Sequence, residues 1–409
     1  MKVLLINCVY KKGSTGKIVY DIYNGLLQDG YECTVCYGRG LNVDEKNVYK
    51  CCWELYAKLN NLFSRFTGVM YGGCLLSTLN LFHIILKEKP DIVHVHCING
   101  YFVNIYRLIT FLKKHNIKTV LTLHAEFMYT ANCSYSLECV RWMEGCGKCP
   151  RLKQETKSLF LDNTALSWKK MKKAFEGFDR NLVVASVSPW LQERARYSPI
   201  LIGKKHVTVY NGLDTSVFCL SEKNDSLRCD FGLANKKIVF HATSGFLTDK
   251  NHIKGGYYVV EMAKRFLATD KDVVFVIAGS YDNLSDIPPN VILLGKVTDQ
   301  KNLAKWYSTA DVTLITSKKE TFSMIVAESL CCGTPVVGFE AGAPEMITIP
   351  EFSDFISYGN SDKLFDMLKT YLYFKTFDRK NVSTQAQMKY GKKKMVNQYQ
   401  MIYKEMMNK

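Results

Sequence analysis

Short apolar runs alternate with helical stretches along the whole chain of 409 residues, and this alternation constrains the fold more than any other feature. The runs are rich in Val, Ile and Leu, which is typical of strands that are buried on both faces of a parallel sheet. A parallel sheet joined by crossover helices is a doubly wound α/β domain. The strand-like runs are residues 2–7, 31–37, 90–96, 118–124, 181–188, 205–211, 237–243, 273–280, 291–297, 312–317 and 336–339.

The alternation restarts after an Asn-Gly turn at 211–212, and a chain of this length can form two cores of ordinary size. We therefore expect two domains, 1–216 and 217–380. A last helix is predicted over 381–409, where Lys and Met are frequent.

The composition is that of a soluble globular protein, with 47% hydrophobic and 22% charged residues. No apolar run is long enough for a membrane-spanning helix. The first apolar run, residues 2–7, is also too short for a signal peptide, so we expect a cytoplasmic protein.

The net charge is +16, and most of the excess lies in the first half. A basic surface can attract nucleic acid, an anionic membrane or acidic substrates. No nucleic-acid module is recognisable. The lysines of residues 169–173, with Trp168 and Phe175, indicate either a face that rests on lipid headgroups at the inner membrane surface or a solvated helix face.

Residues 320–328 read Glu-Thr-Phe-Ser-Met-Ile-Val-Ala-Glu and follow the strand-like run 312–317. Apolar residues recur at helical spacing from Ser323, so Glu320 falls in the loop at a helix start and Glu328 about two turns later. The free N–H groups of the first helical turn favour an anion there. Alternatively, Glu320 caps the helix and Glu328 is a surface charge.

This motif, continued by Gly333, Pro335 and Val336, resembles the donor-site signature of retaining glycosyltransferases of family 4, also called group 1. The resemblance implies a GT-B fold, with two Rossmann-like doubly wound domains facing a central cleft and a C-terminal helix that packs back on the first domain. Ser323 stands where the family more often has Gly, and Ser tolerates a positive φ less well.

The resemblance also implies the activity. A hexosyltransferase-like enzyme would move a sugar from a UDP- or GDP-linked donor to a glycan or lipid-linked glycan in surface polysaccharide biosynthesis, with retention of the anomeric configuration. No catalytic metal is expected, because cationic side chains and helix N-termini can stabilise the diphosphate. The alternatives are a sugar-nucleotide epimerase of the same fold and a non-catalytic scaffold stapled by zinc.

Three residues carry the chemistry that the resemblance implies. His124 ends a strand-like run and would contact the donor sugar. Glu320 would orient the sugar hydroxyls and stabilise charge at the anomeric carbon. Lys254, at a helix start beside two glycines, would neutralise the leaving diphosphate.

Further residues would bind the donor. Gly13 and Gly16 lie in a loop between the first strand and a helix, which is typical of a phosphate cradle, although a tight turn alone would also explain them. Ser244 lies near the position where the family has Arg, so Lys250 is a second candidate for the diphosphate. The expected donor-contacting residues are Gly13, Gly16, Ser244, Lys250, Lys254, Val297, Phe322, Ser323, Met324 and Glu328.

An insertion at 133–149 carries four cysteines with the spacing C-x5-C-x6-C-x2-C followed by Pro. This spacing favours a structural zinc site formed by Cys133, Cys139, Cys146 and Cys149. Disulfides and unrelated thiols are the alternatives, and a reducing cytoplasm disfavours disulfides. The insertion resembles that of family 4 transferases similar to a colanic acid biosynthesis enzyme.

Overall fold

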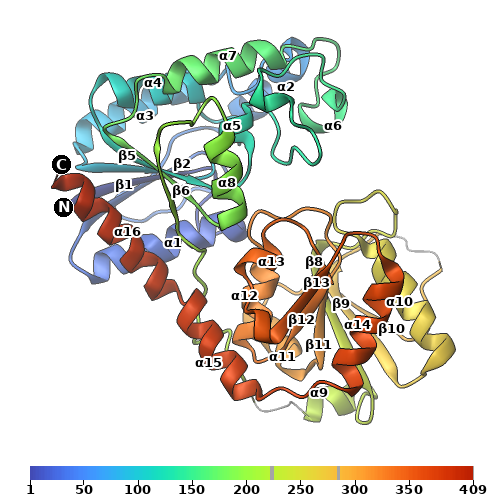
Figure 1. The fold of residues 1–409 in the computed structure, drawn as a ribbon. Coiled ribbons are helices and arrows are strands. Elements are labelled where there is room, and N and C mark those ends of the chain that lie inside the picture. The colour runs from blue at the N-terminus through green and yellow to red at the C-terminus, as the bar shows by residue number, and fades with distance from the viewer. Residues whose placement is uncertain (222–224, 283–285, 409) are drawn as a thin grey trace. The chain divides into compact units, whose positions relative to one another are not determined.

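The computed structural model describes residues 1–221, 225–282 and 286–408. The chain forms two compact units, which we call unit 1 (Met1–Gly212 with Met395–Lys409) and unit 2 (Leu213–Lys394) (Figure 1). Each unit is a parallel sheet with helices on its faces, as the alternation of strands and helices predicts. No helix among the residues described combines the length and the apolar character needed to cross a bilayer.

Unit 1 contains a seven-stranded parallel sheet in the order β3-β2-β1-β4-β5-β6-β7 within its described residues. The strands are β1 Lys2–Asn7, β2 Glu32–Tyr37, β3 Val48–Lys50, β4 Ile92–Val95, β5 Lys118–Leu123, β6 Leu182–Ser186 and β7 Lys205–Thr208. The helices are α1 Gly13–Gln28, α2 Glu54–Thr67, α3 Leu75–Glu88, α4 Ile105–Lys114, α5 Phe127–Thr130, α6 Leu152–Glu155, α7 Thr164–Phe175, α8 Pro189–Tyr197 and α16 Lys392–Met407.

Unit 2 contains a six-stranded parallel sheet in the order β10-β9-β8-β11-β12-β13 within the part of the chain described. The strands are β8 Lys237–Gly245, β9 Val273–Ser280, β10 Val291–Gly295, β11 Val312–Ile315, β12 Val336–Phe339 and β13 Ser353–Ile356. The helices are α9 Asp225–Asp230, α10 Gly256–Thr269, α11 Gln300–Thr309, α12 Met324–Cys331, α13 Pro344–Ile347, α14 Ser361–Tyr373 and α15 Arg379–Tyr390.

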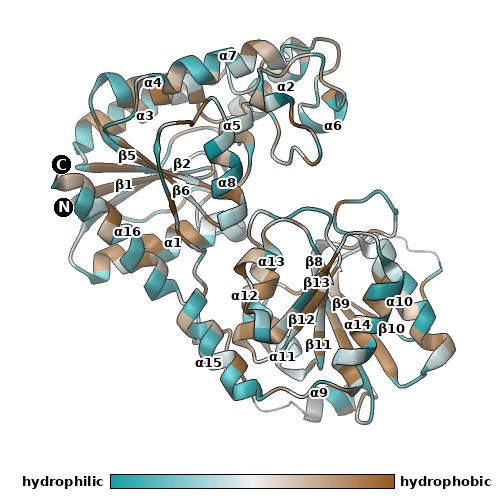
Figure 2. Ribbon diagram, in the orientation of Figure 1, coloured by the Kyte–Doolittle hydropathy of each residue, from teal (hydrophilic) through white to brown (hydrophobic). Residues whose placement is uncertain are grey.

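Every strand-like run found in the sequence is a strand in the structure. Hydrophobic residues concentrate in these strands, which are the brown segments of both sheets (Figure 2). Two short strands, β3 and β13, were not predicted. Both lie at an edge of their sheet and are only partly buried, so their sequences lack a continuous apolar signal.

The order of the strands determines where ligands can bind. In unit 1 the chain changes direction across the sheet between β1 and β4, and in unit 2 between β8 and β11. In open α/β sheets, ligands bind beyond the carboxyl ends of the strands at such a switch point. The loops that follow β1, β4, β8 and β11 are therefore the first places to look for a site.

The tail differs from the single helix predicted over 381–409. It forms two helices, α15 and α16, which are separated at Gly391, and the last residue lies outside the described part of the chain. Met395, Tyr399 and Tyr403 of α16 are buried in the same core as Val3 of β1. The end of the chain thus completes the hydrophobic core of unit 1.

The aromatic residues near the 169–173 lysines do not face outward, as the headgroup-contact hypothesis supposed. Trp168 is 7% exposed and Phe175 is fully buried, whereas the lysines of α7 are exposed. Apart from Leu166, which is 40% exposed, the apolar side of α7 packs inward, so this helix presents mainly its lysines to solvent. The hypothesis that these aromatic residues contact lipid is therefore wrong.

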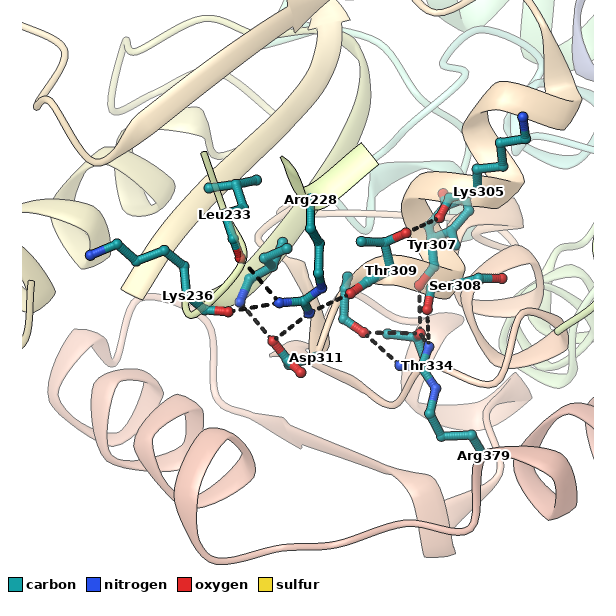
Figure 3. Close-up of polar contacts among 12 residues, drawn as sticks. Arg228, Leu233, Lys236, Lys305, Tyr307, Ser308, Thr309, Asp311, Thr334 and Arg379 are labelled. Atoms are coloured by element: carbon teal, nitrogen blue, oxygen red, sulfur yellow. Dashed lines mark hydrogen bonds and ion pairs between the residues drawn. The ribbon is translucent and has the colours of Figure 1, made fainter. Parts of the chain in front are cut away.

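Two arginines bind the carboxyl end of α11 in unit 2 (Figure 3). Arg379 donates hydrogen bonds to the carbonyls of Ser308 (2.6 Å) and Ala310 (3.1 Å), and Arg228 donates to that of Thr309 (2.9 Å). These carbonyls have no partner within the helix, and cations also interact favourably with the negative end of the helix dipole. Arg379 of α15 therefore joins the start of the tail to the centre of unit 2.

We expect Arg379→Met to destabilise the protein by about 2–4 kcal/mol, because it leaves buried carbonyls without donors. Urea denaturation followed by circular dichroism measures the change. The neighbouring Lys380 is exposed, so Lys380→Met is the matched control. Equal midpoints for the two variants would contradict this role of Arg379.

Candidate active site

The loops after β8 and β11 approach each other closely at Gly255. This residue has φ +66°, and a Cβ placed on it would lie 2.0 Å from the Thr316 carbonyl oxygen. A Cβ on Gly256 would lie 2.4 Å from the Leu247 carbonyl oxygen. Any side chain at either position would force the backbone apart. Gly255 is therefore required for the two loops to meet at the switch point of unit 2, and Gly256 for the close folding of the loop after β8 on itself.

The close approach places Lys254 next to Glu320. The Lys254 ammonium lies 2.7 Å from the Glu320 carboxylate. The Glu320 backbone is also fixed, since its N–H donates to the Ala341 carbonyl (2.9 Å) and its carbonyl accepts from the Ala343 N–H (3.3 Å). Glu320 is only 9% exposed. The structure thus brings together two of the three residues that the sequence assigned to catalysis.

The turn that holds Glu320 is itself capped by Glu345. The Glu345 carboxylate accepts hydrogen bonds from the N–H groups of Ala341 (3.0 Å) and Gly342 (2.8 Å). The carboxylate satisfies two backbone donors that would otherwise lack partners. Glu345 therefore stabilises the backbone to which Glu320 is attached, a function that the sequence analysis did not identify.

His241 of β8 is buried behind this ion pair. Burial, together with a smaller effect of the nearby Lys254 ammonium, lowers the pKa of His241 to about 4. Its Nδ1 lies 2.9 Å from the Leu314 carbonyl oxygen. The imidazole is therefore neutral at pH 7 and adds no charge beside Lys254 and Glu320.

Helix α12 begins at a strained residue. Ser323, its N-cap, has φ +73° and ψ 86°, a region that costs a residue with a Cβ about 1–2 kcal/mol. Its side chain makes no capping hydrogen bond, and among the described residues its hydroxyl has no partner. The family more often has Gly here, and the structure keeps the conformation that Gly would adopt. The N-terminus of α12 thus lacks a side-chain cap.

Glu328 lies farther along α12 and is oriented by Tyr307 of α11. The Tyr307 hydroxyl donates a hydrogen bond of 3.0 Å to the Glu328 carboxylate. Burial raises the pKa of Tyr307 well above its ordinary value, and Glu328 raises it further, so the phenol stays protonated. Tyr307 was not identified from the sequence, where no motif distinguishes it from the other aromatic residues of the chain.

Among the described residues, none of the other expected donor contacts is a partner in the Lys254–Glu320 ion pair. The Lys250 ammonium lies over the Tyr257 ring, 5.4 Å from its centroid. The Ser244 carbonyl accepts from the Ser280 hydroxyl (2.8 Å). Val297 follows β10 at the edge of the sheet. Of the neighbours of Ser323 at the start of α12, Phe322 is buried and Met324 is partly exposed.

In unit 1, the loop after β1 folds closely over the start of α1. Gly13 begins the helix with φ +65°, and no side chain caps this end. A Cβ on Gly16 would lie 3.2 Å from the Val9 side chain, and the Gly16 carbonyl accepts from the Lys11 N–H (3.2 Å). The loop therefore has the geometry of a helix N-terminus open to an anion.

His124 follows β5 and is half-buried beside two fully buried histidines, His94 and His96. Its Nε2 lies 3.2 Å from Nδ1 of His96, whose ring is 3.9 Å from that of His94. His94 is held on both sides, by the Tyr403 hydroxyl at 2.6 Å and the Thr122 hydroxyl at 2.7 Å. Helix α16 thus contributes a tyrosine to the network that supports His124, and this contact was not predicted.

Burial keeps these histidines neutral. It lowers the pKa of His124 to about 4, and it lowers those of His94 and His96 well below their ordinary value. At pH 7, His124 therefore presents an uncharged imidazole that can exchange hydrogen bonds with a sugar hydroxyl. A cationic role for His124 would not fit this environment.

The same burial predicts a loss of stability in acid. Between pH 6.5 and about 4, the unfolded chain binds a proton at His124 whereas the folded protein does not. The free energy of unfolding should therefore fall as the pH falls through this window, by up to about 3 kcal/mol for this histidine alone. Urea midpoints measured at several pH values follow the effect.

His124→Asn should make this pH dependence shallower, because it removes one of the groups that bind protons only after unfolding. The same change at the exposed His83 is the control and should leave the slope unchanged. If the free energy of unfolding depends on pH as steeply in both variants as in the parent protein, the neutral state of His124 in the folded protein is not the cause of that dependence.

The four cysteines of the insertion do not form a metal site in this structure. Among the residues described, no group of three or more Cys, His, Asp or Glu side chains is placed to hold a metal ion. Cys133, Cys139, Cys146 and Cys149 are all free thiols of intermediate exposure. Burial raises the pKa of Cys146 to about 12, so without a metal this thiol stays protonated. The predicted zinc site is not confirmed.

Comparison with known families gives two matches. Residues 15–217 match the family described as "Glycosyltransferase Family 4", and residues 238–372 match "Glycosyl transferases group 1". The two matches lie one after the other and include Gly16, His124, Lys254, Glu320 and Glu328.

Single proteins and solved structures agree with these matches. The chain is 21% identical to the putative colanic acid biosynthesis glycosyl transferase WcaC of Escherichia coli (strain K12), over 84% of each chain. Its fold is similar to that of sucrose-phosphate synthase from Thermosynechococcus elongatus (TM-score 0.69, 16% identity, 100% and 99% of the two chains). It is also similar to HepE of Anabaena solved with UDP (TM-score 0.64, 15% identity, 99% and 100%).

Proposed function

We propose that this protein transfers a sugar from a nucleotide sugar to a glycan or lipid-linked glycan and that the anomeric configuration of the sugar is retained. The chain belongs to the group 1, or family 4, glycosyltransferases and has their GT-B class of fold, which supports this proposal. The observation that best supports this proposal is the Lys254–Glu320 ion pair beside the uncapped start of α12. A cation, a carboxylate and free backbone N–H groups at a switch point suit a donor with a diphosphate and a sugar.

In this proposal Lys254 neutralises the leaving diphosphate. The ammonium is partly exposed while its partner Glu320 is nearly buried, so an incoming phosphate can approach the Lys254 side of the pair. The N-terminus of α12 supplies further positive potential. Charge stabilisation by preorganised groups of this kind is a large term in transfer chemistry, and we assign it to these groups rather than to a divalent cation.

In the same proposal, Glu320 binds the donor sugar. Its backbone is fixed at two points on the 341–343 turn, so its carboxylate can hold a sugar hydroxyl in one orientation. It also stabilises positive charge that develops at the anomeric carbon as the leaving group departs. Glu328, oriented by Tyr307, binds the ribose hydroxyls. For His124 of unit 1, whose imidazole is neutral, we propose a hydrogen bond with a sugar hydroxyl.

The proposed transfer takes place on one face of the sugar. The bond from the anomeric carbon to the phosphate oxygen breaks, and the acceptor oxygen forms its bond on the same face. The acceptor proton passes to the departing phosphate oxygen, so no protein nucleophile is required. UDP is the first nucleotide to test, because the related fold of HepE was solved with UDP, and GDP is the second.

The acceptor we propose is a glycan, carried on a lipid at the cytoplasmic face of the membrane. The similarity to a colanic acid transferase supports a polysaccharide pathway. The basic excess in the first half of the chain supports a location near anionic lipid.

Lys254→Met should lower kcat by about 10²–10³-fold, because the leaving diphosphate loses its cation. Release of nucleoside diphosphate from UDP- and GDP-sugars, with and without chelator, measures the rate. Lys250→Met is the control, since the Lys250 ammonium lies over an aromatic ring rather than beside Glu320. If Lys250→Met carries the loss and Lys254→Met does not, the diphosphate has been assigned to the wrong lysine.

A further inference from the structure

Helix α2 turns its apolar side chains toward solvent. Only Ala57 and Ser64 are buried in this helix of 14 residues. Five large apolar side chains recur at positions i, i+4, i+7, i+8 and i+11, which form one face, and each is between 45% and 70% exposed. In most globular proteins a stripe of this kind packs against the core. The five residues are Leu55, Leu59, Leu62, Phe63 and Phe66.

The segment at 159–161 extends this stripe. The Leu159 N–H donates to the Arg65 carbonyl (2.8 Å), which ties the segment to the end of α2. The rings of Phe66 and Phe160 stack with centroids 6.3 Å apart. Phe160 is 75% exposed and Leu161 is 52% exposed. We call the five α2 residues together with Phe160 and Leu161 the α2 surface.

Cations border the α2 surface. Arg65, Lys153 and Lys157 line a hollow of about 570 Å³ together with Ser158 and Leu159. Lys153 belongs to α6, which lies at the same end of unit 1 as α2 (Figure 1). The hollow is therefore a concave basic site that adjoins exposed aromatic and leucine side chains.

Within the described residues, Arg65, Lys153 and Lys157 take part in no ion pair with a carboxylate. The acidic residues nearest in sequence already have partners, since Glu54 pairs with Arg39 (2.8 Å) and Glu155 pairs with Arg151. The positive charge of the hollow is thus available to an external anion.

We propose that the α2 surface docks onto an anionic lipid bilayer, with its apolar side chains in the boundary between headgroups and acyl chains and a headgroup phosphate in the Arg65–Lys153–Lys157 hollow. Helices that lie in a membrane interface combine an apolar face bearing Leu, Phe and Trp with flanking Lys and Arg. Trp53, the N-cap of α2, is 79% exposed and adds an aromatic side chain at the interface.

This proposal rests on the proposed function, because it assigns the membrane contact of that function to the α2 surface. Vesicle binding can nevertheless be measured without any transfer activity. The two ideas can therefore fail separately. If the parent protein transfers sugar to a soluble acceptor but does not bind anionic vesicles, only the docking surface is in doubt. If vesicle binding persists in a protein that transfers no sugar, only the proposed reaction is in doubt.

The test is sedimentation with vesicles of phosphatidylglycerol and phosphatidylcholine, against vesicles of phosphatidylcholine alone. The protein should bind the anionic vesicles and not the neutral ones. Lys153→Glu with Lys157→Glu should weaken binding by at least about 25-fold, since each basic residue at an anionic surface contributes about fivefold. Lys172→Glu with Lys173→Glu on α7 is the matched control, because it changes the net charge by the same amount at residues outside the α2 surface.

The apolar contribution is tested by Leu59→Ser with Phe63→Ser and Phe66→Ser. All three side chains are exposed, so the folded state should survive, and circular dichroism checks it. This variant should lose vesicle binding, whereas Leu41→Ser with Ile202→Ser, at exposed sites elsewhere in unit 1, should keep it. The proposal is overturned if the parent protein does not bind anionic vesicles. It is also overturned if the serine variant binds them normally. A change of that variant from dimer to monomer in sedimentation velocity would then assign the surface to a second copy of the chain.

Discussion

The contact between the loops after β8 and β11 is the constraint on which the candidate site depends. Gly255 permits that contact, because a Cβ there would overlap the Thr316 carbonyl. Once the loops meet, Lys254 lies beside Glu320, and the Glu320 backbone can pair with the turn capped by Glu345. A single backbone requirement thus arranges a cation and a carboxylate at the point where the sheet changes direction.

In unit 1, the candidate residue His124 is held in place by neutral side chains rather than by an ion pair. His124 is supported by a chain of neutral, buried histidines, and His94 at the far end is held by Tyr403 of α16. The last helix therefore does more than fill the core, since it supplies a hydrogen bond to the network below His124. In unit 2, the charges of Lys254 and Glu320 are paired with each other. In unit 1, burial keeps the imidazole of His124 uncharged.

The sequence predicted the parts of the fold whose signals are local and continuous. Buried strands show as apolar runs, and loops that need glycine show as Gly13, Gly16 and Gly255. Edge strands such as β3 carry no such run, and the break at Gly391 was hidden in a stretch of helix-forming residues.

The site was predictable only to the level of residue types and motifs. Glu320 and Lys254 were found through their motif, but Tyr307 and His94 were not, because their roles depend on contacts between residues far apart in the chain. The four-cysteine spacing predicted a metal site, which the described residues do not confirm. Side-chain direction is set by tertiary packing, which a linear pattern does not contain.

The most direct test of the central claim is to follow the anomeric proton of the sugar by NMR while the purified protein consumes a nucleotide sugar. The account predicts that the first product keeps the anomeric configuration of the donor and that Glu320→Gln slows its appearance. A product of inverted configuration, or no turnover of any UDP- or GDP-sugar, would contradict the account.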